Sequence, residues 1–270
     1  MADYERILIT GAAGSLGAQL REGLADFAPR LRLADRADMG VAAANEELVV
    51  CDLADRQAAF ACIDGCDAIV HFAGNPHEHP FDELLRDGLP AAYNIWEGAR
   101  RHGVKRIVHA SSIHAVGFCE VEEVPDTRVP HRPDTFYGLG KCFVEDLAAL
   151  YWDKWGLETV CLRIGSCSPE PADRRMLWSW LSAADLVRLT EAALTAPRVG
   201  FSVIYGTSDN AQAAVSNAFA THIGFVPRDS ADGHAPAVLE LTPRPDPHAR
   251  ATRVIGGGFA AAGHPDDDRR

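Results

Sequence analysis

A glycine-rich segment after the first apolar run constrains the fold of this chain more than any other feature. Residues 6–9 are mostly apolar, and three glycines then open a stretch that has leucines at helical spacing. In a strand-turn-helix unit, the first glycine allows a tight turn, the second lets the backbone approach a pyrophosphate, and the third lets the helix pack on the strand. The segment therefore predicts a dinucleotide site at a helix N-terminus, formed by Gly11, Ala13, Gly14, Ser15, Leu16 and Gly17.

Four further short apolar runs repeat the pattern of the first, and segments with helical periodicity separate several of them. The runs lie at 31–34, 48–51, 68–72 and 106–110. Near-continuous apolar runs of this length are typical of parallel strands that helices cover on both faces. We therefore predict an α/β fold of the Rossmann type, a doubly wound parallel sheet.

The second half of the chain continues this alternation. We expect a helix at 137–155, strands at 158–163 and 199–205, a helix near 211–220, and a helix capped by Ser182 with Asp185 in the capping-box position. No linker-like change in composition interrupts the series, which predicts one domain over residues 1–270. Within it we expect an NAD-binding core (1–165), a small C-terminal substrate-binding region (166–260) and a frayed tail (261–270).

The charge balance excludes several classes of partner. The chain has 26 Lys and Arg against 38 Asp and Glu and no basic stripe, so we expect neither nucleic acid nor a membrane as a partner. It has no apolar stretch of membrane-spanning length and no secretory pattern in its first six residues, which predicts a cytoplasmic protein. Seven cysteines, mostly in apolar segments, suit reduced thiols. The oligomeric state stays open, a homo-oligomer included.

Two aspartates follow predicted strands at positions where an adenosine would lie. Asp35 ends the second strand, 18 residues after Gly17, where a carboxylate accepts hydrogen bonds from the ribose hydroxyls. The same carboxylate would repel a 2′-phosphate, which Arg36 offsets only in part, so we predict NAD rather than NADP as the cofactor. Asp52 is either an adenine contact or the cap of the next helix.

The candidate catalytic residues lie at the end of the fifth predicted strand and at the start of the helix that follows. Tyr137 and Lys141 are four residues apart, which places them on one face of a helix. The strand before that helix ends in Ser111 and Ser112, and a Rossmann site has its chemistry at strand ends.

This set resembles the short-chain dehydrogenase/reductase superfamily, in its extended, epimerase/dehydratase-like branch, from residue 6 to about 260. The resemblance implies that Tyr137 is the general base, that Lys141 holds the ribose and stabilises the tyrosinate, and that Ser112 hydrogen-bonds the reacting oxygen. On the same resemblance, the cofactor site also includes Leu53, Ala73, Gly74, Ser111, Tyr137, Lys141 and Ile164.

Further segments resemble the uronate dehydrogenases within that superfamily: 33–36, 51–55, 132–138, 141–143, 163–171 and 175–177. Those enzymes oxidise the anomeric hydroxyl of glucuronate or galacturonate with NAD to an aldaro-lactone. The resemblance implies that Arg175 binds the uronate carboxylate in a bidentate pair, unless it is a surface arginine in a charged run. It predicts a substrate site of Asn75, Pro76, His77, Ser112, Ile113, His114, Tyr137, Ser166, Arg175 and Phe259.

Four positions depart from the uronate dehydrogenase pattern. Ile113 stands in place of an asparagine, Pro76 and Gly140 in place of serines, and Gly88 in place of an asparagine. Each change removes a group that orients a polyol. The alternatives are an NAD-dependent dehydrogenase of another aldose or acidic sugar, a nucleotide-sugar epimerase or dehydratase, and a non-catalytic NAD sensor.

Several histidines invite a second interpretation. His77 and His79 flank Glu78 in a pattern that suits a metal, but no further ligand cluster supports one. We therefore expect a solvated loop and no metal. His71 lies inside a predicted strand and is expected to be a hydrogen-bonded core residue.

Overall fold

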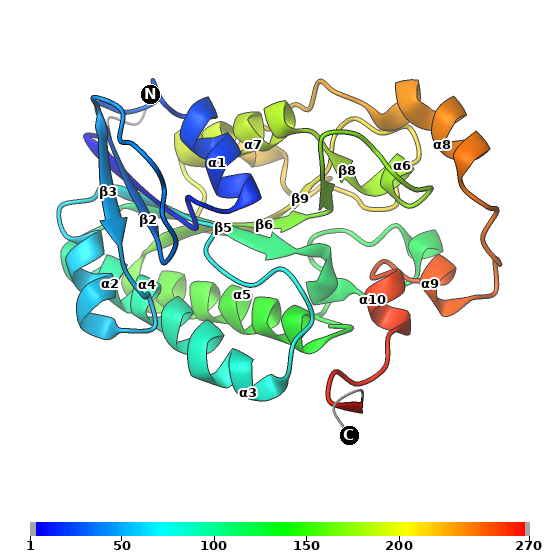
Figure 1. Cartoon of the computed structure of the whole chain (residues 1–270), viewed down its shortest axis with the longest axis horizontal. Helices are drawn as coiled ribbons and strands as arrows, with labels where there is room; N and C mark the ends of the chain where they lie inside the picture. Colours follow the sequence, from blue (N-terminus) through cyan, green and yellow to red (C-terminus); the bar gives the residue numbers. More distant parts are fainter. Residues whose placement is uncertain (1–3, 268–270) are drawn as a thin grey trace.

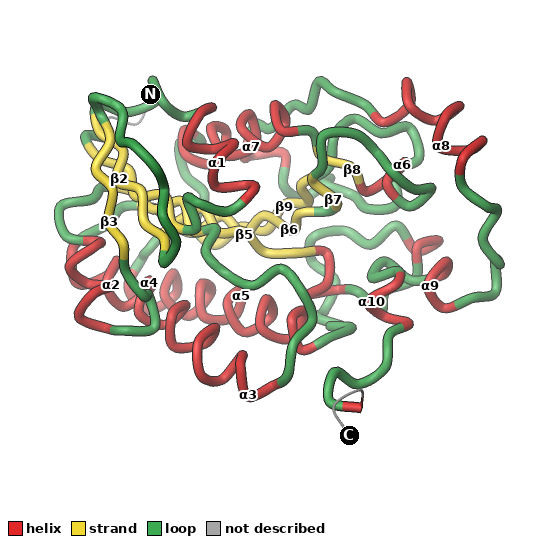
Figure 2. Tube along the Cα trace, viewed as in Figure 1, coloured by secondary structure: helices red, strands yellow, loops and turns green. Residues whose placement is uncertain are grey.

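The computed structural model describes residues 4–267, and its centre is a seven-stranded parallel sheet (Figures 1 and 2). The strand order is β3-β2-β1-β4-β5-β6-β9, and every neighbouring pair is parallel. The order reverses between β1 and β4, where an open α/β sheet forms its ligand crevice. This arrangement confirms the predicted Rossmann-type fold. The strands are β1 (Arg6–Thr10), β2 (Arg30–Asp35), β3 (Glu46–Val50), β4 (Ala68–His71), β5 (Arg106–Ser112), β6 (Glu158–Ile164) and β9 (Phe201–Gly206).

Two layers of helices cover the sheet (Figure 1). One face carries α1 (Ser15–Gly23) and α7 (Ala183–Thr195), and the other carries α2 (Arg56–Ile63), α4 (Leu89–His102) and α5 (Phe136–Trp155). Side chains of a strand point alternately to the two faces. Accordingly, Ile7 and Ile9 of β1 belong to the apolar core under α1 and α7, whereas Leu8 belongs to the core under α2, α4 and α5.

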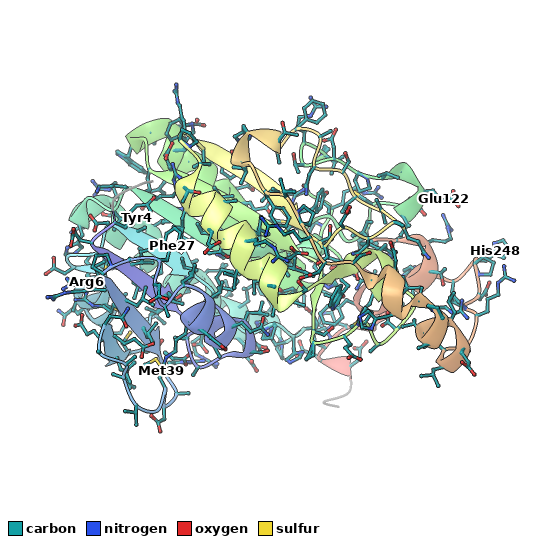
Figure 3. The ribbon with its side chains drawn as sticks, turned by 90° about the horizontal axis from the view of Figure 1, so that it is seen from above. Tyr4, Arg6, Phe27, Met39, Glu122 and His248 are labelled. Atoms are coloured by element: carbon teal, nitrogen blue, oxygen red, sulfur yellow. The ribbon has the colours of Figure 1, made fainter. Side chains whose placement is uncertain are left out.

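The helices α1 and α7 lie side by side over their face of the sheet (Figure 3). Gly23 permits this close approach, because a Cβ there would lie 2.3 Å from Cγ2 of Val187. The N-terminal segment is tied to the same layer, since the Tyr4 hydroxyl donates to the carbonyl of Leu194.

Most predicted elements form at the expected places, and the exceptions have identifiable causes. The helix expected near 211–220 is wrong: the segment is irregular, and only a short 3-10 turn follows it, η4 (Thr221–Ile223). The Asn217 side chain bonds both backbone groups of Tyr205 and so holds this segment against β9. Ser182 caps α7 as predicted, but the Asp185 carboxylate accepts from Ser208 and Arg188 instead of closing a capping box.

Short elements complete the fold. Strands β7 (Ser166–Cys167) and β8 (Trp180–Leu181) pair with each other. The short helices and turns are α3 (Phe81–Glu83), η1 (Leu84–Gly88), η2 (Ile113–Val116), η3 (Val121–Glu123), α6 (Met176–Ser179), η5 (Ala231–His234), α8 (Ala235–Leu241), α9 (Arg250–Arg253) and α10 (Gly258–Ala261). Of these, α3 and η1 help to line a cavity.

The C-terminal segment returns to the loop after β5, so that α9 and α10 lie near the start of α5 (Figure 1). The amides of Ile255 and Gly256 donate to the carbonyls of Cys119 and Gly117. Residues 261–264 of the predicted tail are exposed, and 268–270 lie outside the described residues.

Candidate active site

The glycine-rich loop has the geometry that a pyrophosphate requires. Gly11 has φ +73°, and a Cβ there would lie 2.6 Å from the amide nitrogen of Ala73. A Cβ at Gly17 would lie 2.0 Å from the carbonyl oxygen of Gly11. Helix α1 begins at Ser15, and Gly14 before it offers no side-chain cap to the first amides. The loop thus presents a helix N-terminus to the crevice, which fits a bound phosphate.

A cavity of about 550 Å³ runs from this loop to the start of α5. Many predicted residues line it: Gly11, Ala13, Gly14, Asp35, Asp52, Leu53, Ala73, Gly74, Asn75, Tyr137 and Lys141. The predicted cofactor residues Ser15, Leu16, Gly17, Ser111 and Ile164 do not. Leu16 and Ile164 pack in the apolar core, and the Ser111 hydroxyl points away to Glu145 at 2.5 Å.

Backbone amides fix the Asp35 carboxylate at the end of β2. One oxygen accepts from the amide of Ala13 and the other from that of Ala37, both at 3.0 Å. The carboxylate lines the cavity beside Arg36, a position that fits the ribose of a bound NAD. The structure distinguishes between the two interpretations of Asp52. Asp55, not Asp52, caps α2, and Asp52 lines the cavity.

Tyr137 and Lys141 lie on one face of α5, as the spacing predicts. The Lys141 ammonium lies 5.3 Å from the centroid of the Tyr137 ring and donates to the Ala110 carbonyl at 2.6 Å. Ser112 ends β5, and its hydroxyl oxygen accepts from the amide of His114. The Lys141 bond joins the start of α5 to β5; Tyr137 and Lys141 line the cavity, whereas Ser112 lies outside its lining.

The start of α5 is held by an unexpected partner. The two carboxylate oxygens of Glu78 accept from the amides of Phe136 and Tyr137, each at 3.0 Å. This negative charge at the helix N-terminus also suits the helix dipole. Sequence reasoning missed this role because Glu78 lies 58 residues before Phe136 and stands in the histidine pattern that suggested a metal.

Arg175 and Ser166 contact each other, and neither is among the residues that line the cavity. The guanidinium donates to the Ile255 carbonyl from Nε and Nη2 and to the Ser166 hydroxyl from Nη1. The Cζ atom of Arg175 lies 5.1 Å from the centroid of the Trp178 ring. Burial lowers the pKa of the guanidinium. The alternative that Arg175 is a surface arginine in a charged run is therefore wrong.

Helix α10 brings Phe259 against His114 and Tyr137. The rings of Phe259 and His114 stack with their centroids 4.5 Å apart, and the Tyr137 ring meets each of them edge-on at 5.7 to 6.4 Å. His114 Nδ1 lies 2.7 Å from a carboxylate oxygen of Asp134. Sequence reasoning missed Asp134, although its place directly before the helix cap Thr135 is a signal that was available.

Ile113 does not face the crevice in the way a sugar contact would. Its side chain is 1% exposed and packs in an apolar cluster with Trp178, Tyr205 and Ile255. The predicted direct effect on the substrate is therefore wrong, and Ile113 acts as support beneath the Trp178 ring. Pro76 and His77 are exposed and do not line the cavity.

The two glycine departures belong to the cofactor cavity rather than to a sugar pocket. Gly88 and Gly140 both line it. A Cβ at Gly140 would lie 2.8 Å from Cδ1 of Leu84, and one at Gly88 would lie 3.0 Å from the same atom. A side chain at either position would thus meet the same methyl group of Leu84.

The histidine pattern has a structural explanation. Glu78 is engaged by backbone amides, and His79 Nδ1 lies 2.7 Å from the His77 carbonyl oxygen. Within residues 4–267, no three His, Cys, Asp or Glu side chains gather as a metal site would require. The buried His71 bonds the Thr10 hydroxyl at 2.8 Å, which confirms it as a hydrogen-bonded core residue. No helix in the described part of the chain is long and apolar enough to cross a membrane.

Comparison with known proteins agrees with this geometry. The NAD dependent epimerase/dehydratase family matches residues 7–176. The chain belongs to this family. Among its relatives, the uronate dehydrogenase of Pseudomonas putida is 46% identical over 96% of this chain and 97% of its own length.

Two solved structures are similar to this chain in both fold and sequence. The glucuronic acid dehydrogenase of Chromohalobacter salexigens has a TM-score of 0.95 and 44% identity, with 98% of this chain and 99% of that chain covered. A tyrosine-to-alanine variant of the Agrobacterium tumefaciens uronate dehydrogenase, complexed with NAD, has a TM-score of 0.92 and 45% identity, with 96% and 98% covered.

Proposed function

We propose that this chain catalyses the NAD-dependent oxidation of the anomeric hydroxyl of a hexuronate, glucuronate or galacturonate, to the aldaro-lactone. The observation that carries this proposal is the place of Arg175. Its half-buried guanidinium bonds Ser166 and lies against Gly257, two residues before Phe259, whose ring contacts that of Tyr137. A sugar carboxylate there would form a charge-assisted, two-point bond. The relatives named uronate dehydrogenases support the same substrate class.

The chain's own residues account for the proton transfer. The Tyr137 phenolate oxygen takes the proton of the anomeric O–H as a base, and the Lys141 ammonium, 5.3 Å from the centroid of the ring, stabilises this tyrosinate. The Ser112 hydroxyl hydrogen-bonds the same substrate oxygen. Bound NAD would accept the hydride that leaves the anomeric carbon, so that the C–O bond becomes the lactone carbonyl. The proton and the hydride together are the two hydrogens that the sugar loses.

NAD fits the residues that are present. Asp35 is oriented for ribose hydroxyls, and Gly11 and Gly17 leave the space that the loop needs for a pyrophosphate. We place the enzyme in the cytoplasm, since its cysteine pattern suits a reducing compartment, and we propose no membrane or nucleic acid partner.

A second substrate, another aldose or acidic sugar, is favoured by one observation. Ile113 stands where the family pattern has an amide, and it packs in an apolar cluster with Trp178, whose ring lies against the Arg175 guanidinium. Its influence on the preferred sugar would therefore be indirect, through the packing around Arg175. This candidate keeps the same catalytic residues and differs only in the preferred sugar.

A panel of uronic acids and neutral aldoses with NAD, followed by NADH absorbance, tests the proposal. Glucuronate or galacturonate should give the highest kcat/KM, with one NADH released per sugar consumed. Tyr137→Phe is the matched control, because it removes only the hydroxyl. A neutral aldose that outperforms both uronates would establish the second substrate instead. An epimer formed without NADH release would refute the oxidation.

A further inference from the structure

The ring of His114 is held on three sides. The Phe259 ring stacks on it with the centroids 4.5 Å apart, the Tyr137 ring lies steeply tilted to it with the centroids 5.7 Å apart, and Asp134 bonds Nδ1 at 2.7 Å. The imidazole is 14% exposed, whereas the Asp134 side chain is fully buried. A ring restrained in this way presents its remaining nitrogen, Nε2, in one fixed direction.

Three glycines make room for the Asp134 carboxylate. A Cβ at Gly256 would lie 1.6 Å from Oδ2 of Asp134, and one at Gly117 would lie 2.1 Å from it. A Cβ at Gly138 would lie 3.1 Å from Oδ1. These glycines come from the loop after β5, the start of α5 and the C-terminal segment. Segments far apart in the sequence are thus packed around one acidic side chain, which a carboxylate of purely local function would not need.

Capping of α5 does not explain this carboxylate. Thr135 is the cap residue, and its hydroxyl oxygen accepts from the amide of Gly138 at 2.9 Å. Glu78 takes the amides of Phe136 and Tyr137. The recorded bonds of the Asp134 carboxylate are instead to the Thr135 hydroxyl and to His114. Burial of a carboxylate costs free energy, so the bond to His114 is the contact that calls for an explanation.

We propose that Asp134 is a positioning residue that fixes the tautomer of His114. A carboxylate accepts hydrogen bonds and cannot donate them, so the contact requires the imidazole proton on Nδ1. Nε2 is then an acceptor for a hydroxyl of the substrate, next to the reacting end at Tyr137. The substrate part of this inference rests on the proposed sugar oxidation, whereas the tautomer is a property of the protein alone.

The tautomer is measured directly on the full chain. Long-range proton-nitrogen NMR spectra of histidine-labelled protein in mildly alkaline buffer distinguish a protonated from an unprotonated ring nitrogen, and His114→Gln identifies the signals among the 11 histidines. Wild type should show His114 protonated on Nδ1 only. Asp134→Asn keeps the size of the side chain, and its amide can either accept from or donate to Nδ1, so the Nε2-protonated tautomer should become populated. A wild-type His114 protonated on Nε2, or on both nitrogens, would overturn the proposal even if no sugar were ever turned over.

Kinetics tests the consequence for the substrate. Asp134→Asn should lower kcat/KM for the best sugar by about 5- to 150-fold, because a substrate hydroxyl then meets a donor instead of an acceptor. NAD affinity should not change. In a His114→Phe background, Asp134→Asn should have no further effect, since the two residues act through one contact.

Asp185→Asn is the matched control. Asp185 is also a fully buried carboxylate, but it accepts from Arg188, from the Ser208 hydroxyl and from the amides of Arg228 and Asp229, none of which lines the cavity. This variant should lower the melting temperature and leave both the His114 tautomer and the KM unchanged. If Asp134→Asn lowers kcat/KM equally with and without the His114 ring, Asp134 does not act through His114 and the proposal fails.

Discussion

Replacing Arg175 by alanine should affect acidic sugars far more than neutral ones. The guanidinium has five N–H groups, and its contacts within the described residues use one on Nε, one on Nη1 and one on Nη2. One N–H therefore remains on each terminal nitrogen, which is what a two-point bond with a carboxylate needs. The site is arranged to bind a carboxylate while the arginine stays anchored to the protein.

The size of the effect follows from what is lost. Truncating one partner of a desolvated, hydrogen-bonded charge pair costs about 2 to 5 kcal/mol. At about 1.4 kcal/mol per tenfold, kcat/KM for a uronate should fall by about thirtyfold to a few thousandfold. For a neutral aldose, kcat/KM should fall only through an indirect effect. The variant lacks the Arg175 bonds to Ser166 and Ile255 that hold the wall of the pocket. This indirect effect should be about two- to tenfold.

The assay is a comparison of kcat/KM for a uronate and for the best neutral aldose in each variant. Arg175→Lys should recover only part of the loss, because an ammonium cannot present two parallel N–H groups. Arg174→Ala is the matched control, since Arg174 bonds the carbonyls of Leu239 and Thr242 and neither Ser166 nor Ile255. If Arg175→Ala lowers kcat/KM for both substrates by the same factor, Arg175 has only a structural role. The structure then gives no physical reason to propose an acidic substrate.

Three further variants test other parts of the site, and a fourth tests a partly buried ion pair outside the cavity, between His131 and Glu145. Tyr137→Phe should reduce kcat below about 10% of wild type while the NAD dissociation constant, measured by fluorescence titration, stays unchanged. Asp35→Ala should narrow the preference for NAD over NADP in kcat/KM, and an unchanged ratio would refute the role of its carboxylate. Ile113→Asn should lower the melting temperature and leave the uronate-to-aldose ratio within about twofold, because its side chain is 1% exposed in an apolar cluster. The hydrogen bond to Glu145 raises the pKa of His131, so its charged form stabilises the fold below the unfolded pKa and that stability is lost as the pH rises through the raised value. His131→Gln should therefore lower the melting temperature in acidic buffer more than in alkaline buffer, and an equal loss at all pH values would contradict this linkage.

The sequence by itself determined those features that depend on neighbours along the chain. Alternation and run length placed the strands, because residues of a buried parallel strand contact helices on both faces. Gly11 and Gly17 were informative since no other residue fits the turn and the helix contact, as their Cβ distances of 2.6 and 2.0 Å show. The four-residue spacing of Tyr137 and Lys141 fixed their common helix face.

Only the tertiary structure decided which distant segments meet at the crevice. Glu78 meets α5 across 58 residues, and Arg175 meets Ile255 across 80. Ile113 shows the same limit, since neither its sequence position nor the family pattern told whether its side chain faced the sugar or the core. Such contacts depend on the strand order and on the paths of irregular loops. Local periodicity does not indicate the strand order or the loop paths. A long-range contact forms, and stabilises the fold, only after the sheet has brought the two segments together.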